Sequence, residues 1–184
     1  YDLVMDLNPN TQNLAGVTTV LAEVLDAPLT TMDLHLLGNM SVHSVTSGGN
    51  NTTFSHASNI LTVNLDRTYQ PGELITVVVD YDGNPASDYF GWSNFGGEHL
   101  IWTLSEPYGA RNWWPCKDLN TDKADSVDLH VTVDDDLIVA SNGLLVSETV
   151  PSPGKKTYHW EERYPIPTYL VSLAIHPYAT FSNT

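Results

Sequence analysis

Hydrophobic and polar residues alternate along most of this chain. In the first segment, residues 1–7, the apolar side chains of Leu3, Met5 and Leu7 occupy every second position. A period of two places these side chains on one face of a β-strand, so that one face is buried and the other is solvated. The same alternation predicts about eleven strands, at residues 1–7, 17–25, 32–37, 40–45, 60–65, 73–81, 99–104, 127–133, 137–143, 156–162 and 168–175.

Turn-forming residues separate these segments. The clusters "SGGNNT", "YQPGE" and "PSPGKK" are rich in Gly, Pro, Asn and Ser, which favour turns through their backbone freedom or side-chain hydrogen bonds. No segment predicts a long helix, and "DKADS" would form a single turn at most. We therefore expect an all-β fold, an antiparallel two-sheet sandwich with Greek-key-like connections, formed by residues 1–184 as a single domain.

Composition narrows the classes of partner. With 184 residues and 41% hydrophobic content, the chain can bury one sizeable core. Its 22 Asp and Glu against 7 Lys and Arg give a formal net charge of −15. Nucleic acid and anionic membranes both require a basic face, so neither is expected as a partner. An acidic surface would accept a cationic group such as a peptide amino terminus, although such acidity more commonly serves solubility.

The sequence lacks the motifs of several common kinds of functional site. The single cysteine, Cys116, excludes an intrachain disulfide framework and a cysteine zinc cluster. The seven histidines, at positions 35, 43, 56, 99, 130, 159 and 176, never adopt a close metal-ligand spacing, so no metal site is expected in this chain. There is no membrane-spanning apolar run. The start at Tyr1 suggests that an upstream segment was removed, and a secreted or periplasmic location is favoured over a cytoplasmic one.

The stretch "LSEPYGARNWWPCKDLNTDKADSVDLHVTV", residues 104–133, combines unusual residues in one connection between strands. Trp113 and Trp114 offer large apolar surfaces, Pro115 fixes the chain direction, and Cys116 acts as a small buried hydrophobic side chain. These four residues are expected to pack in the core.

The charged residues of this stretch differ in their expected roles. Arg111 could pair with Asp118 or stack on an indole ring, and it is expected to contribute to packing. Glu106 ends the segment "HLIWTLSE", residues 99–106, just before Pro107, and a strand end commonly presents its side chains to a neighbour or a cleft. Glu106 is therefore the candidate for binding a ligand.

This stretch resembles the signature of the amino-terminal β domain of zinc aminopeptidases of the aminopeptidase N and leukotriene hydrolase type. That signature runs Thr-Gln-x-Glu-(Pro)-x-x-Ala-Arg-x-x-Phe-Pro-Cys-x-Asp-x-Pro-x-x-Lys-Ala, and its Lys corresponds to Lys123. The segments "IVASNG" at 138–143 and "PTYLVSLAI" at 167–175 resemble further anchors of the same domain, in the same order. Leu104 stands where the family commonly has Gln, and Asn120 stands where it commonly has Pro.

The resemblance implies a role within a larger enzyme. In the family, the signature Glu binds the free α-ammonium of a peptide substrate, and this Glu corresponds to Glu106, with Leu104 and Ser105 as neighbours on the substrate side. The resemblance also implies zinc and a thermolysin-like catalytic domain downstream, because the family's His-Glu-x-x-His motif is missing from this chain. The chain alone is then expected to be an inactive amino-terminal piece, with its catalytic domain and peptide substrates as partners.

A stand-alone β-sandwich module that binds carbohydrate or protein is the alternative. The aromatic residues in "SDYFGWSNFGG", among them Tyr89, Phe90 and Trp92, are expected to be exposed and could stack on sugar rings. A His-Glu-x-x-His motif downstream in the parent gene would favour the aminopeptidase, and its absence would favour the module.

Overall fold

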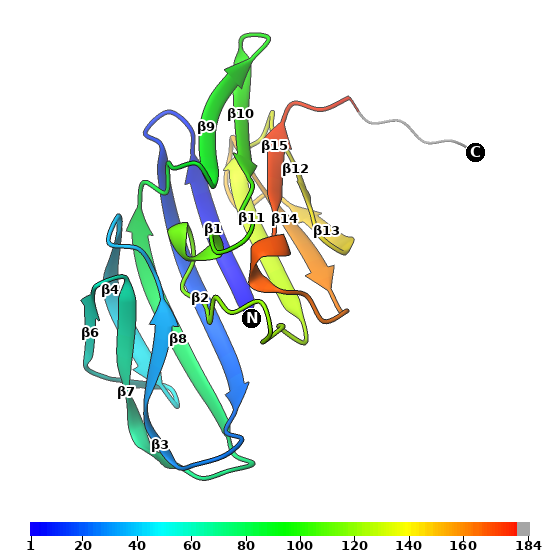
Figure 1. Ribbon diagram of the computed structural model, residues 1–184. Helices are drawn as coiled ribbons and strands as arrows, with labels where there is room; N and C mark the ends of the chain where they lie inside the picture. The colour runs from blue at the N-terminus through cyan, green and yellow to red at the C-terminus, as the bar shows by residue number, and fades with distance from the viewer. Residues whose placement is uncertain (180–184) are drawn as a thin grey trace.

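The computed structural model describes residues 1–179 and consists almost entirely of β-strands (Figure 1). The strands are β1 (Asp2–Asn8), β2 (Asn13–Glu23), β3 (Leu29–His35), β4 (Met40–Ser47), β5 (Asn50–Asn51), β6 (Phe54–Ala57), β7 (Ile60–Tyr69), β8 (Leu74–Gly83), β9 (Phe90–Phe95), β10 (Glu98–Thr103), β11 (Val127–Asp134), β12 (Ile138–Ser141), β13 (Leu144–Thr149), β14 (Lys155–Glu162) and β15 (Leu173–His176). Two short 3-10 turns, η1 (Ala110–Asn112) and η2 (Thr168–Leu170), interrupt the connections. Within the described residues, no helix is long and apolar enough to cross a membrane.

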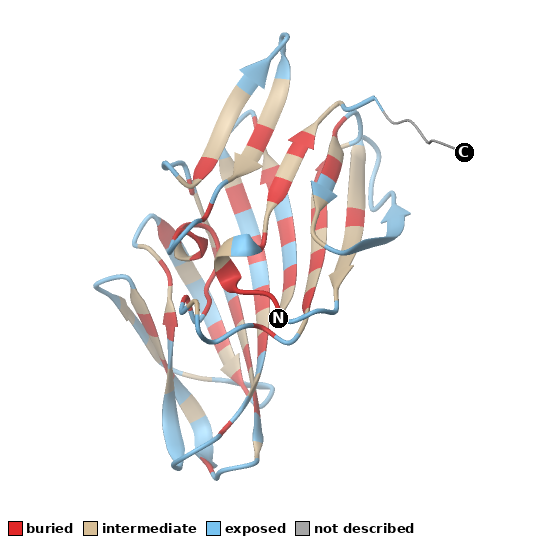
Figure 2. Ribbon diagram, turned by 45° about the vertical axis from the view of Figure 1, so that its right-hand side comes forward, coloured by how far each residue is buried: buried red, intermediate tan, exposed pale blue. Residues whose placement is uncertain are grey.

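The largest sheet has eight strands. Its eight strands run in the order β13-β14-β11-β1-β2-β8-β4-β5. Along β1 the side chains of Leu3, Met5 and Leu7 are buried, and those of Val4 and Asp6 between them are exposed. Figure 2 shows the same alternation of buried and exposed residues along the neighbouring strands. One face of this sheet therefore forms a wall of the core, as the period of two predicts.

Two smaller sheets lie on the same side of the large sheet (Figure 1). One has four strands in the order β12-β15-β10-β9, and the other has three in the order β3-β7-β6. Their inward side chains, among them Ile101 of β10 and Val63 of β7, join the inner face of the large sheet in one hydrophobic core. The sheets are held by this burial of apolar surface between them.

The all-β class is confirmed, and the structure adds details that the pattern did not resolve. There are three sheets instead of two, and β1 pairs with β11 in parallel. Four strands escaped prediction, and each lies at the edge of its sheet: β5, β6, β9 and β13. Every residue of β5 and β13 is exposed, β6 has no buried residue, and β9 has only Phe90 buried. A strand at a sheet edge with no buried face leaves no alternation of apolar and polar residues to detect.

Candidate functional site

Buried anchors fix the backbone on both sides of Glu106. Ser105 is buried, and its Oγ accepts a hydrogen bond from Trp113 Nε1 at 3.1 Å. The Gly109 N–H donates to the Ser105 carbonyl at 2.7 Å and closes a turn around Glu106. A Cβ at Gly109 would come within 2.4 Å of the Tyr89 ring, so only glycine allows this close approach. The turn thus holds an exposed residue on a rigid support.

Glu106 itself points away from the core. It is exposed, and a cis peptide bond joins it to Pro107. In contrast to the buried Asp118 nearby, its carboxylate forms no side-chain hydrogen bond or ion pair with any residue in the range 1–179. A free carboxylate on a fixed turn can accept hydrogen bonds from a cationic ligand without first breaking an internal contact.

A groove with a volume of about 590 Å³ borders Glu106. One wall consists of residues 103–106 at the end of β10, and the other consists of the segment from Glu162 to Ser172, which includes η2. Lys123 and Asn142 complete the lining. These segments are far apart in sequence, and the pairing of β10 with β15 brings them together.

The wall opposite Glu106 is held by polar contacts. Thr168 of η2 donates its hydroxyl to Asp118 Oδ1 at 2.9 Å, and Asp118 Oδ2 accepts from Arg111 Nε at 2.7 Å. Asn142 donates to the Leu170 carbonyl at 3.0 Å and accepts from the Ser172 N–H at 2.7 Å. The signature stretch and the segment around η2 are therefore tied to each other beneath the groove.

The charges in the groove are mixed. Glu106 and Glu162 contribute carboxylates, and Lys123 contributes the one cationic side chain among the lining residues. Lys123 is exposed, in contrast to the packing residues of the signature stretch. The groove can accordingly offer an acidic partner to an ammonium group and a basic partner to a carboxylate, within a rim that also contains aromatic and apolar side chains.

The packing expected for the signature stretch is present. Trp113, Trp114 and Cys116 are fully buried, and Pro115 is buried with them. Burial raises the pKa of the Cys116 thiol well above its ordinary value, so the thiol stays protonated and is a poor nucleophile. Leu104 is 64% exposed at the groove, while Ser105 has its hydroxyl committed to Trp113.

None of the three aromatic residues that suggested a carbohydrate platform is fully exposed, since Tyr89 and Trp92 are half-buried and Phe90 is buried. Phe90 is fully buried, and its ring lies 5.1 Å from that of Trp92 between centroids. Trp92 packs against the core and donates its Nε1–H to Asn84 Oδ1 at 3.1 Å. The expectation of exposed stacking rings is therefore wrong for Phe90, because β9 turns it toward the core.

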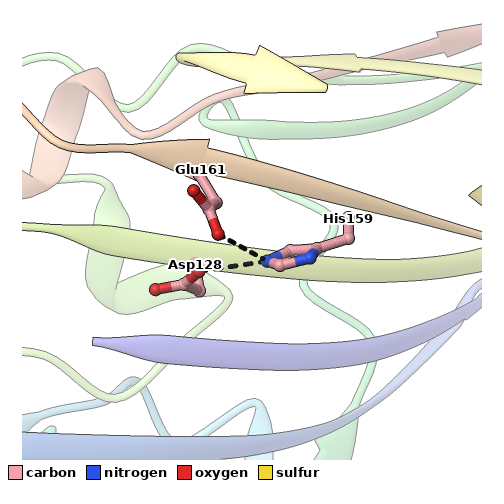
Figure 3. A group of neighbouring side chains, drawn as sticks. All are labelled: Asp128, His159 and Glu161. Carbon is pink, nitrogen blue, oxygen red and sulfur yellow. Dashed lines mark hydrogen bonds and ion pairs between the residues drawn. The ribbon is translucent and has the colours of Figure 1, made fainter. Parts of the chain in front are cut away.

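One group of possible metal ligands was missed by sequence reasoning. Asp128 of β11 and His159 and Glu161 of β14 each place one ligand atom within 4.8 Å of the others (Figure 3). The pairing of β11 with β14 creates this group from positions 31 residues apart. Short-range motif spacing could not have revealed it.

The sequence of this chain matches a known protein family. Residues 1–170 match the model of the peptidase M1 N-terminal domain. The chain belongs to this family. No sequence among the curated proteins matches.

Solved structures of M1 enzymes share the fold. The M1 zinc metallopeptidase from Deinococcus radiodurans is 30% identical with a TM-score of 0.84, over 95% of this chain and 40% of that one. A mutant of that metallopeptidase bound to a Tyr-Ser-Ala substrate is 31% identical with a TM-score of 0.84, again over 95% of this chain and 40% of that one. Yeast LTA4 hydrolase in complex with bestatin, at 20% identity, shares the fold with a TM-score of 0.72, over 95% of this chain and 27% of that one. This M1 domain thus spans less than half the length of these enzymes.

Proposed function

We propose that this M1 domain caps the catalytic domain of a zinc-dependent aminopeptidase and that Glu106 binds the free amino end of the peptide substrate. The free carboxylate of Glu106, fixed at the edge of a groove, is the observation that supports this role most directly. An ammonium group held by a carboxylate would place the first peptide bond at a constant distance from Glu106. That arrangement selects peptides with a free amino end.

A second argument concerns the surface around the groove. Leu104 is 64% exposed and Tyr164 is 82% exposed, and both line the groove. Leu170 adds another exposed apolar side chain. Apolar surface gathered around a polar groove is typical of a face that another domain covers. The length of the M1 enzymes, of which this chain matches 40%, leaves room for such a domain in the same polypeptide.

The catalytic zinc would be held outside this chain. The sequence contains no His-Glu-x-x-His motif, and no histidine lines the groove. The residues of this groove therefore do not fit a zinc site, and their part in the reaction is to bind and orient the peptide. By itself, the 184-residue chain is expected to hydrolyse no aminoacyl arylamide.

The deciding experiment replaces Glu106 in the complete enzyme. Glu106→Ala should keep the fold and the zinc content but lower kcat/KM, because the loss of a charge-assisted hydrogen bond costs roughly 1.5–3 kcal/mol, about ten- to a hundredfold. Glu106→Gln keeps an acceptor without the charge and should fall between. Wild-type enzyme should discriminate strongly against peptides with an acetylated amino end, and the alanine variant should discriminate less.

Glu98 provides a matched control, since it is an exposed glutamate at the first residue of β10, whereas Glu106 lies three residues beyond the last residue of that strand. Glu98→Ala should leave kcat/KM and the preference for free amino ends unchanged. If Glu106→Ala also kept both at the wild-type level, Glu106 would be an ordinary surface carboxylate and the proposed role would be wrong.

A further inference from the structure

The outer face of the large sheet contains a cluster of histidines and carboxylates on β1, β11 and β14, none of which lines the groove beside Glu106. On β11 and β14, Asp128 pairs with Glu161 and His130 pairs with His159 in the strand register. Asp2 of β1 is the parallel partner of Asp128 on the other side. Three adjacent strands therefore align these five side chains on the solvated face, where side chains from neighbouring strands lie close together.

Three of these side chains converge on one point (Figure 3). His159 Nε2 lies 3.0 Å from Asp128 Oδ1 and 3.9 Å from Glu161 Oε1. One imidazole nitrogen and two carboxylate oxygens form a donor set that suits a borderline-soft divalent cation such as Zn²⁺, with bonds of about 2.0–2.2 Å. Shifts of less than about an ångström would bring the three atoms to tetrahedral spacing around such an ion.

A cationic side chain already lies at this point. Arg163 donates to both oxygens of Asp128, at 2.7 and 2.9 Å, and its Nη2 lies 3.0 Å from Glu161 Oε1. The position between the two carboxylates is therefore suited to positive charge. The Arg163 side chain is 47% exposed, so it can rotate into solvent and leave the two carboxylates to another cation.

A second observation indicates that Arg163 does not satisfy the whole cluster. The Oδ1 atom of Asp2 is buried and has no hydrogen-bond partner among the described residues. Across from it, His130 Nε2 lies 3.7 Å away, too far for a hydrogen bond, while the His130 ring stacks on that of His159 at 3.9 Å between centroids. The Asp2 side chain as a whole is 49% exposed, so only this one oxygen is shielded from water, and a nearby cation would give it a partner.

Charge also favours a dication. Asp2, Asp128 and Glu161 carry three negative charges, which outnumber the positive charges of Arg163 and the nearby Tyr1 ammonium, in a chain with a formal net charge of −15. We propose that this face binds a divalent transition-metal ion of the zinc type through His159 Nε2, Asp128 and Glu161, in competition with Arg163. The carboxylate of Asp2 and the ring of His130 lie beside the ion and contribute charge and support. This site does not depend on the role proposed for Glu106.

Zinc titration of the 184-residue chain tests the site, with calorimetry as the readout and ZnCl₂ as the probe. The wild type should bind zinc saturably. Arg163→Gln should bind more tightly, by about tenfold, because the competing guanidinium is gone. His159→Gln and Glu161→Gln should each remove saturable binding. Circular dichroism would confirm that each variant is folded, and zinc-dependent shifts of the His159 ring resonances in the wild type would locate the ion without any substitution.

His43 offers a matched control. It forms a histidine–carboxylate pair of similar length with Asp82, 2.8 Å apart, although this pair is more exposed than His159 and Asp128. No second carboxylate converges on that pair within the described residues. His43→Gln should therefore bind zinc as the wild type does. Zinc binding that is lost equally in His43→Gln and His159→Gln, or that is absent from both the wild type and Arg163→Gln, would overturn the proposal.

Discussion

Arg111 donates its Nε–H to Asp118 Oδ2 across 2.7 Å, and the Asp118 side chain is completely shielded from solvent. The other carboxylate oxygen accepts from Thr168, so every part of this buried charge has a partner. Arg111→Ala would leave the carboxylate buried without its counter-ion, which typically costs about 3–5 kcal/mol. We expect a large decrease in the free energy of unfolding, measured by urea denaturation of the 184-residue chain.

Two comparisons make this prediction specific. Asp118→Asn keeps an acceptor for Thr168 and removes the buried charge, so it should destabilise less than Arg111→Ala. Arg67→Ala breaks the exposed ion pair with Glu73 and should shift the denaturation midpoint only slightly. Equal effects of Arg111→Ala and Arg67→Ala would mean that burial of Asp118 has no energetic consequence.

The two buried tryptophans should respond differently to replacement by phenylalanine. Trp113 Nε1 donates to Ser105 Oγ at 3.1 Å, whereas Trp114 Nε1 is buried without an acceptor in the described part of the chain. Either Trp→Ala should cost about 3–5 kcal/mol through loss of packing. Trp113→Phe should cost about 1 kcal/mol more than Trp114→Phe, because only Trp113 loses a hydrogen bond.

Thermal or urea unfolding of the two Phe variants measures this difference directly. If Trp114→Phe lowered the free energy of unfolding more than Trp113→Phe does, the assignment of an unpaired indole N–H to Trp114 would be wrong. Trp113→Phe has a further expected effect in the complete enzyme. Because Ser105 anchors the turn that carries Glu106, kcat/KM should fall in this variant and remain closer to wild type in Trp114→Phe.

His35 should make the stability of the domain depend on pH. Burial, together with the neighbouring Arg111 guanidinium, lowers the pKa of His35 below its ordinary value of 6.5. Its neutral Nδ1 accepts a hydrogen bond from the Asp118 N–H at 3.2 Å, a bond that protonation would break. The contribution of neutral His35 to the free energy of unfolding is therefore fully present above pH 6.5 and is lost as the pH falls through the lower folded-state pKa. The free energy of unfolding should change by at most roughly 1.4 kcal/mol per pH unit in this range.

His35→Asn provides the measurement for this prediction, because the Asn Oδ1 can accept the same hydrogen bond and does not titrate. The difference in unfolding free energy between wild type and His35→Asn should be constant above pH 6.5 and should change in favour of the variant below it. A difference that stays constant down to acidic pH would show that His35 does not link folding to proton binding.

Local alternation was enough to predict the β class, because strands such as β1 bury one face and expose the other. It could not predict how the strands are ordered: the parallel pairing of β1 with β11 joins segments more than a hundred residues apart. The residue chemistry of the signature stretch pointed to the buried tryptophans and to Glu106. The structure confirms that the two tryptophans are buried, while the binding role of Glu106 stays a prediction.

The remainder of the groove was not predictable from local sequence. Tyr164 and Lys123 reach the groove only because η2 and the signature stretch are joined through Asp118. The Asp128–His159–Glu161 group likewise exists through strand register alone. Sites of this kind depend on contacts between distant segments, whereas a motif reports only residues that are neighbours along the chain.

Leu104 allows a test of what the signature stretch does beyond Glu106. This leucine stands where related signatures commonly have Gln, and it is 64% exposed at the groove, two residues before Glu106. Leu104→Gln would add an amide that can accept a hydrogen bond from the substrate's ammonium. A hydrogen bond from an ammonium group is charge-assisted and contributes about 1.5–3 kcal/mol, so kcat/KM of the complete enzyme for peptides with a free amino end should rise by roughly ten- to a hundredfold.

The rise should disappear for substrates with an acetylated amino end, because they lack the ammonium group. It should also disappear in the Glu106→Ala background, where the ammonium is no longer held next to residue 104. Stability should change little, since an exposed leucine contributes little to the core. If Leu104→Gln lowered kcat/KM equally for free and acetylated peptides, Leu104 would instead be an apolar contact with the substrate or the catalytic domain, and the ammonium would not lie within reach of its side chain.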